Sequence, residues 1–272
     1  MNNALILGPL ALPYPLLLVF VAAALTFFVG KRSAQKGGLA SKVENQLWIT
    51  LLIGLIAARL AFVWEFHSAY GVSPLDVLDI RDGGWSPVAG FTVAWLFALS
   101  QKNRLAALYK PVRSALLTGS VVWFIGAAAL SGSADAGQEL PALSLTSLTG
   151  QTMELTSFKG QPVVVNLWAT LCPPCVREMP VLRQAQIDHP DVTFVFVNQR
   201  ESVQKVGTWL SSRQLGLRNV LLDTQGQVST AFQQRALPTT LFFDAAGHLV
   251  SQRIGGLSPA TLAQELQKTT QK

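Results

Sequence analysis

Four apolar stretches in the first 130 residues restrict what the N-terminal part of this 272-residue chain can fold into. They cover residues 15–30, 47–66, 84–100 and 114–130. A helix needs about 20 apolar residues to cross a bilayer. The second stretch has this length, and the last two lie at the low end of the range. The sequence therefore predicts an all-α transmembrane domain of four helices over residues 1–130.

Basic residues gather in two of the segments that connect these stretches. They are Lys31, Arg32, Lys36 and Lys42 in one segment, and Lys102, Arg104, Lys110 and Arg113 in the other. On the opposite side, no Lys or Arg precedes the first stretch, and Arg81 stands beside Asp76, Asp79 and Asp82. The positive-inside rule then places both basic segments in the cytoplasm, and the N-terminus and everything after residue 130 outside.

The start of the chain argues against a cleaved signal peptide. Such peptides begin with a basic region, and residues 1–14 contain no Lys or Arg. We therefore expect the first stretch to remain as a membrane anchor in the bacterial cytoplasmic (inner) membrane.

The net charge of +6 is too unevenly spread for a nucleic-acid binder. Residues 1–130 carry ten Lys/Arg and five Asp/Glu, whereas residues 131–272 carry eleven and ten. The C-terminal half is thus close to neutral, which excludes a basic surface for nucleic acid. One charge, Arg59, lies near the middle of the second stretch, where an unpaired cation is costly. It is either functional, or its side chain extends toward the outer interface or bonds to neighbouring helix ends.

A different pattern begins after residue 130. Residues 131–139 are small and polar, as in a flexible linker. From residue 140, short β-branched runs alternate with helical periodicity, which predicts one α/β domain over 140–272. We expect strands over 163–168, 192–197, 239–243 and 248–253, helices over 173–187 and 203–214, and a last helix capped by Ser258.

The C-terminal half contains the motif Cys172-Pro-Pro-Cys175 where a strand passes into a helix. A helix N-terminus stabilises a thiolate, so Cys172 is the candidate nucleophile and Cys175 the resolving cysteine of a redox-active disulfide. Pro173 and Pro174 lack amide hydrogens, so we expect the pKa of the Cys172 thiol to be less depressed than in amide-rich motifs. Pro238 precedes a strand and would be cis if its loop turns tightly beside the cysteines.

These residues resemble the TlpA/ResA/DsbE group of membrane-tethered thioredoxin-like oxidoreductases. The resemblance covers residues 140–270 and rests on Trp168-Ala169, the CPPC motif, Glu178 with Pro180, and Pro238 followed by two threonines. It implies a thioredoxin fold, a cis Pro238 and a role for Glu178 in tuning cysteine protonation.

We also expect two side chains, Trp168 and Leu237, to contribute to client docking, although a Trp at such a position is more often part of the core. Two positions depart from the pattern. Leu171 stands where Trp is usual, and Asn166 replaces the buried Asp of thioredoxin. The proton-accepting role would then fall to Glu178 or to water.

The membrane half resembles prolipoprotein diacylglyceryl transferase over roughly residues 15–130. In that family a span with an Arg-Leu pair is followed by a Gly-Gly segment and then by a His-Gly-Gly signature. Arg59-Leu60 and Gly83-Gly84 fit this pattern, but Ser86-Pro87-Val88 occupies the signature position. The resemblance implies a membrane scaffold without transferase activity.

Other functions of the CxxC motif remain open at this point. A zinc site would need two more ligands, and His67, His189 and His248 show no partner spacing, so we expect no metal site. A structural disulfide, a copper-binding module, or a lipoprotein-modifying transferase with an accessory redox domain are the alternatives.

The sequence therefore predicts a protein-disulfide oxidoreductase without a cofactor, anchored in the lipid bilayer. We expect its thioredoxin-like domain to face the periplasm and to act as a reductase of client protein disulfides. Neither cysteine lies in the membrane half, so no thiol relay can cross the bilayer within this chain. A separate electron donor of the DsbD/CcdA type is expected.

Overall fold

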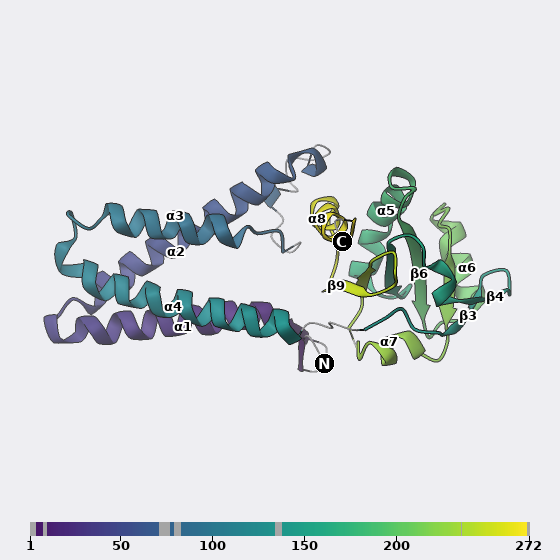
Figure 1. The fold of residues 1–272 in the computed structure, drawn as a ribbon, viewed down its shortest axis with the longest axis horizontal. Coiled ribbons are helices and arrows are strands. Elements are labelled where there is room, and N and C mark those ends of the chain that lie inside the picture. The colour runs from purple at the N-terminus through teal and green to yellow at the C-terminus, as the bar shows by residue number, and fades with distance from the viewer. Residues whose placement is uncertain are drawn as a thin grey trace. The chain divides into compact units, whose positions relative to one another are not determined.

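The computed structural model describes residues 4–7, 10–70, 77–78, 83–133, 138–234 and 236–270. The chain forms two compact units, a helical one (Asn3–Leu78 and Gly83–Gly132) and a C-terminal one (Ser133–Lys272) (Figure 1). The acidic segment with Arg81 and residues 134–137 of the expected linker lie outside the described residues. Residues 131–133 continue the preceding helix, so the helix extends into the expected linker.

The helical unit begins with a short antiparallel hairpin that sequence analysis did not anticipate. Its strands pair Ala4 with Pro13, and the first helix starts directly after Pro13. The elements are β1 (Ala4–Leu7), β2 (Leu10–Pro13), α1 (Tyr14–Ala34), η1 (Gln35–Gly37), α2 (Ala40–Glu65), η2 (His67–Tyr70), α3 (Pro87–Ser100) and α4 (Ala106–Ser133).

Among the described residues of this unit, three helices are long and apolar enough to cross a membrane: α1, α2 and α4. Helix α3 has only 14 residues, which corresponds to about 21 Å of rise and is shorter than a bilayer core of about 30 Å. The prediction of a helical N-terminal region is confirmed, but α3 begins at Pro87, and the four expected spans reduce to three long helices and one short one.

Helix α3 lies against the first two thirds of α2. The amide of Ser86 donates to the carbonyl of Ala58 at 3.0 Å. A methyl group on Gly90 would lie 3.0 Å from the carbonyl oxygen of Gly54, so the two backbones approach closely through small residues. The segment before α3 therefore brings the chain back alongside α2 before α3 begins.

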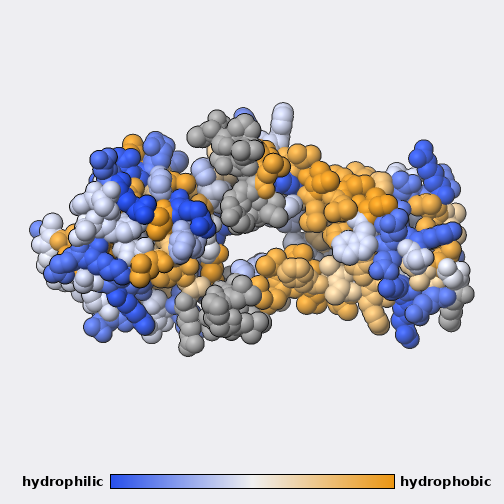
Figure 2. Space-filling view, turned by 180° about the vertical axis from the view of Figure 1, so that it is seen from behind, coloured by the Kyte–Doolittle hydropathy of each residue, from blue (hydrophilic) through white to orange (hydrophobic). Residues whose placement is uncertain are grey.

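Both basic connecting segments lie at the same end of the helical unit. One apolar cluster joins the end of α1 (Ala34), the start of α2 (Val43), the end of α3 (Ala98) and the start of α4 (Leu108). Figure 2 shows hydrophobic residues along the central parts of these helices and hydrophilic residues at this shared end. Large apolar side chains remain exposed along the shafts, among them Phe20, Phe28, Ile56, Leu60, Phe124 and Ile125. This is the surface pattern of helices that contact lipid.

Arg59 is buried in α2 and bonds to the segment that leads into α3. Its guanidinium donates to the carbonyl oxygens of Val77 at 3.0 Å and Gly84 at 2.7 Å. The rings of Tyr70 and Trp85 lie 5.5 and 5.9 Å from its central carbon. Of the two hypotheses for Arg59, the contacts favour the one in which it bonds to neighbouring helix ends.

The C-terminal unit contains a seven-stranded mixed sheet in the order β4-β3-β7-β6-β5-β8-β9, with helices on both faces (Figure 1). The central pairs β5·β6 and β6·β7 are parallel, and β5·β8 and β8·β9 are antiparallel. The elements are β3 (Ser144–Ser147), β4 (Thr152–Glu154), η5 (Leu155–Phe158), β5 (Val163–Trp168), α5 (Pro173–Asp188), β6 (Thr193–Gln199), α6 (Val203–Ser212), β7 (Val220–Asp223), α7 (Gln227–Ala231), β8 (Thr239–Phe243), β9 (Leu249–Ile254) and α8 (Pro259–Thr270).

The alternation of side chains along the strands divides the core of this unit in two. On one face, Val164 and Phe196 pack beneath α5, α6 and α8. On the other, Val165 and Val197 pack with Val228 of α7. The expected thioredoxin-like α/β fold is thus confirmed, with continuous apolar strands buried on both faces.

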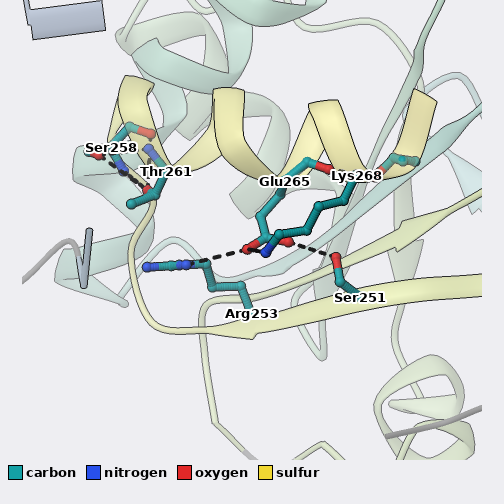
Figure 3. A network of polar contacts seen from close by, with 7 residues as sticks. Ser251, Arg253, Ser258, Thr261, Glu265 and Lys268 are labelled. Atoms are coloured by element: carbon teal, nitrogen blue, oxygen red, sulfur yellow. Dashed lines mark hydrogen bonds and ion pairs between the residues drawn. The ribbon is translucent and has the colours of Figure 1, made fainter. Parts of the chain in front are cut away.

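Polar contacts fix the last helix on the sheet edge (Figure 3). Ser258 caps α8 through a 3.2 Å hydrogen bond from the amide of Thr261, as the sequence predicted. Buried Glu265 accepts from Ser251 at 2.8 Å and contacts Arg253 and Lys268 at 3.5 and 3.0 Å. Helix α8 is therefore bonded to β9 through Glu265.

Candidate active site

The two cysteines lie where β5 passes into α5. Cys172 is the N-cap residue of α5, and its sulfur is bonded to that of Cys175 at 2.09 Å. The amide of Cys175 also donates to the Cys172 Sγ at 3.3 Å. Cys172 is partly exposed, whereas Cys175 is 0% exposed, so only the first sulfur is open to an incoming partner.

The two prolines determine which backbone donors reach the first sulfur. Pro173 and Pro174 occupy the first two positions of α5 and have no amide hydrogen. The amide of Cys175 is consequently the first donor that the helix offers to Cys172. This agrees with the expectation that the thiol pKa of Cys172 is less depressed than in amide-rich motifs, which stays a prediction.

Glu178 lies one helical turn after Cys175 and is only 2% exposed. Its carboxylate accepts from the side-chain amide of Asn166 at 2.8 Å and from the backbone amide of Leu257 at 2.9 Å. Burial raises the pKa of Glu178 to about 7, since desolvation outweighs the two hydrogen bonds that favour the charged form. A carboxyl group that titrates near neutral pH thus lies beside the buried cysteine.

Asn166 connects three elements around this carboxyl group. From β5, its side-chain amide donates both to Glu178 on α5 and to the hydroxyl of Thr240 on β8 at 3.0 Å. Its own Oδ1 is buried without a hydrogen-bond partner among the described residues. Asn166 therefore holds the Glu178 carboxyl in place and, as an amide, cannot take up a proton itself.

The peptide bond between Leu237 and Pro238 is cis, as the resemblance implied. The register pairs Leu167 near the end of β5 with Thr239 at the start of β8. The loop before β8 and the loop that leads to Cys172 therefore lie at the same end of these two strands. Within this loop, the carbonyl of Pro238 accepts from Gly255 at 2.9 Å. The N–H and C=O of Leu237 have no hydrogen-bond partner in the described part of the chain. Leu237 thus offers a free backbone edge.

The structure places Trp168 in the core and not at the surface where we expected it to contact a client. Its side chain is 0% exposed, and its ring packs at 5.1 Å on the ring of Trp209 from α6. Trp168 belongs to the core because α6 covers it. Leu237 is half-buried in the loop before β8, and Leu171, which precedes Cys172 in the chain, is 80% exposed.

Glu201 lies near the site, and no motif or spacing in the sequence marks it as a site residue. Its carboxylate accepts from the amide and hydroxyl of Thr170 at 2.8 and 2.6 Å, from Asn198 at 2.8 Å, and from Lys205 at 2.7 Å. Burial alone would raise its pKa, but these donors outweigh burial and lower the pKa of Glu201 to about 2. The loop that contains Thr170, two residues before Cys172, is therefore hydrogen-bonded to the segment that follows β6.

Each half of the chain matches the model of a known family. The AhpC/TSA family matches residues 136–252, and the prolipoprotein diacylglyceryl transferase family matches residues 3–126. In the second match, Ser86, Pro87 and Val88 still stand where the resemblance expects His-Gly-Gly.

Curated relatives match the C-terminal half. The chain is 31% identical to the thiol-disulfide oxidoreductase ResA of Halalkalibacterium halodurans over 127 residues, which are 46% of this chain and 72% of the relative. It is 29% identical to the thioredoxin-like protein YneN of Bacillus subtilis, over 48% of this chain and 78% of the relative. A ResA of Bacillus cereus is 27% identical over 62% of this chain and 99% of its own length.

Solved structures of similar proteins cover the same half. A thiol:disulfide interchange protein DsbE from Chlorobium tepidum matches with 26% identity and a TM-score of 0.46, over 50% of this chain and 99% of its own. A secreted Mycobacterium tuberculosis disulfide oxidoreductase matches with 26% identity and a TM-score of 0.43, over 46% and 95%.

Proposed function

This chain belongs to the family of thioredoxin-like thiol-disulfide oxidoreductases that includes ResA, and from that premise we propose that it reduces disulfides of periplasmic proteins. It is a protein-disulfide oxidoreductase joined to a helical region of the prolipoprotein diacylglyceryl transferase family. The observation that carries the proposal is the difference in exposure between the two bonded sulfurs, with Cys172 open and Cys175 buried beside Glu178.

The proposed reaction begins from the reduced dithiol. The Cys172 thiolate attacks one sulfur of a client disulfide, which breaks the client's S–S bond, forms a mixed disulfide and releases one client thiolate. The Cys175 thiolate then attacks the Cys172 sulfur and releases the second client thiolate. Two electrons pass from the dithiol to the client, and the enzyme is left with the Cys172–Cys175 disulfide.

Glu178 supplies the acceptor for the proton that Cys175 must lose before the second step. The two residues are three positions apart on α5 and share one face of the helix. Because the pKa of Glu178 is raised to about 7, its carboxylate can take up a proton at neutral pH and return it to solvent. Asn166 and Leu257 keep it oriented during the exchange.

The client binds as an extended segment along the Leu237–Pro238 loop. The unpaired N–H and C=O of Leu237 are suited to pair with a client backbone, and exposed Leu171 and half-buried Leu237 contact its side chains. A backbone-directed contact of this kind accepts clients of different sequence.

The orientation in the membrane follows from charge. Both basic segments meet at one end of the helical unit, which we place in the cytoplasm. Helix α4 then leads outward, and the catalytic unit lies in the periplasm. The helical half contains no cysteine, so electrons come from a separate membrane donor of the DsbD/CcdA type.

The test is the variant Cys175→Ser in the full-length protein. It retains the attacking thiol and loses the resolving one, so clients and donor accumulate as mixed disulfides that mass spectrometry identifies after alkylation and non-reducing separation. Cys172→Ser is the matched control and should trap nothing. Equal adducts in both variants, or none in either, would contradict the assignment of Cys172 as nucleophile.

A further inference from the structure

The end of the helical unit at which both basic segments meet has no part in the proposed reaction. Glu44 is the one acidic residue in the sequence of these segments, and it is paired with Lys31 at 2.9 Å. This end therefore carries an excess of positive charge that its own carboxylates do not neutralise. Its exposed cations among the described residues are Lys31, Arg32, Lys42, Lys102, Arg104, Lys110 and Arg113.

Two of these cations lie near the same aromatic ring. The Nζ of Lys102, in the turn between α3 and α4, lies 6.0 Å from the centre of the Tyr109 ring, and the central guanidinium carbon of Arg113 lies 5.8 Å from it. Neither cation forms an ion pair in the described part of the chain. The ring attracts both charges although they repel each other, so an anion beside them would stabilise the arrangement.

An exposed apolar strip continues from Arg113 along α4. It consists of Leu117, Val121 and Phe124, which are 48%, 53% and 58% exposed. These residues follow Arg113 at helical spacing, so their side chains share one face of α4 with the guanidinium. From Arg113 to Phe124 the helix rises about 17 Å, which is close to half of a bilayer core of about 30 Å. The strip therefore has the length of one lipid leaflet, with the cations at its polar end.

We propose that Lys102, Tyr109, Arg113 and the apolar strip bind one anionic phospholipid, with its phosphate at the two cations and an acyl chain along α4. A free phosphate would use the cations and leave the strip uncovered, so a lipid is the occupant that accounts for both. The site is separate from Arg59, which lies about 24 Å of helix rise beyond Val43 at the basic end of α2. The inference is independent of the proposed redox function and of the leaflet in which this end lies.

The charge preference is tested by native mass spectrometry of the full-length protein, delipidated in detergent and titrated with one lipid at a time. Dioleoylphosphatidylglycerol and dioleoylphosphatidylethanolamine share their acyl chains and differ in net charge. We expect the wild type to bind the anionic lipid about fivefold more tightly, because its charge is not balanced within the head group. Equal affinity for the two lipids would overturn the proposal.

A pair of matched variants separates this site from the general charge of the basic end. Arg113→Gln and Arg104→Gln each remove one exposed cation, but Arg104 has no ring contact or ion pair in the described part of the chain. We expect Arg113→Gln to weaken phosphatidylglycerol binding about fivefold and Arg104→Gln to change it less than twofold. Equal weakening by the two variants would show that the lipid responds to diffuse charge, and it would overturn the assignment of the site.

Two further measurements keep the test decisive. A large excess of inorganic phosphate should leave the bound phosphatidylglycerol in place, because the acyl chain holds the lipid on the strip; its complete displacement would assign the cations to free phosphate instead. The thermal midpoint of each lipid-free variant in detergent checks its folding. If Arg113→Gln does not fold, Lys102→Gln makes the same comparison with Arg104→Gln, since Lys102 lies near the same ring.

Discussion

The side-chain amide of Asn166 donates a 2.8 Å hydrogen bond to the carboxyl group of Glu178, and both side chains are almost completely buried. The contact joins β5 to α5 directly behind the cysteines. It also explains how a carboxyl group with a pKa of about 7 is kept in the core, since its two oxygens are bonded to Asn166 and Leu257.

The first prediction concerns the dependence of stability on pH. The pKa of Glu178 is raised from 4.5 to about 7, so its contribution to stability is complete below pH 4.5 and is lost as pH rises through 7. Relative to Glu178→Gln, the wild-type unfolding free energy should fall by roughly 3 kcal/mol over this range. The oxidised full-length protein is unfolded in urea, and cleavage of the C-terminal unit by a protease reports how much of that unit is unfolded. The difference between the two proteins follows from these curves.

The comparison with Glu178→Gln isolates one carboxyl group from the others. Glu201 has the opposite shift, to about 2, so its contribution is present above pH 4.5 and is lost as pH falls through 2. It is common to both proteins and cancels in the difference. A difference that stays constant from pH 4.5 to 7 would mean that Glu178 does not titrate there.

The second prediction concerns the tie between Glu201 and Thr170. Glu201→Ala removes the acceptor of the Thr170 amide and hydroxyl, and we expect a loss of about 2 kcal/mol at pH 7. It should also slow formation of the mixed disulfide in Cys175→Ser, because the loop before Cys172 loses its anchor. Stopped-flow reaction with a peptide disulfide measures this rate. Glu154→Ala, an exposed carboxylate, is the control and should change neither quantity.

The third prediction concerns the close approach of α2 and α3. In Gly90→Ala the added methyl group would lie 3.0 Å from the Gly54 carbonyl oxygen and from the Ala58 Cβ, so the helices must separate. We expect a loss of about 1–3 kcal/mol in the helical unit. Thermal aggregation in detergent measures it against Gly37→Ala, whose methyl group has 3.8 Å to its nearest neighbour. Equal midpoints for the two variants would contradict the packing.

The fourth prediction concerns Arg59. Arg59→Leu leaves the carbonyl oxygens of Val77 and Gly84 without this donor, so the amount of protein in the membrane should fall. The activity per molecule towards a small disulfide should remain that of the wild type, since Arg59 serves the scaffold. A selective loss of activity at a normal protein level would instead indicate that Arg59 takes part in the reaction.

Several parts of the fold and site could be predicted because the signal is local. Strand β5 is a continuous apolar run, α5 begins at a Cys-Pro-Pro-Cys motif, and Ser258 with Pro259 begins α8. The β8–β9 hairpin follows from its turn residues, Asp244-Ala245-Ala246-Gly247. In each case neighbouring residues determine the element.

The parts that were missed are short elements, a helix start inside an apolar run, or contacts with distant residues. Strand β7 and helix α7 have four and five residues, too short for a periodicity to be recognised. Glu201 reaches Thr170 across 31 positions, and Trp168 is buried because α6 supplies Trp209. The hydropathy of residues 84–100 did not reveal that a proline at 87 begins a helix of only 14 residues.

The most direct test of the account is the labelling of Cys172 from outside the cell. In spheroplasts that express full-length Cys175→Ser, a membrane-impermeant maleimide should modify Cys172 without permeabilisation, and prior incubation with a peptide disulfide should block it. Labelling that appears only after the membrane is permeabilised would place the reacting sulfur in the cytoplasm. No labelling in either condition would show that the sulfur is not accessible, and either result would contradict the proposed function.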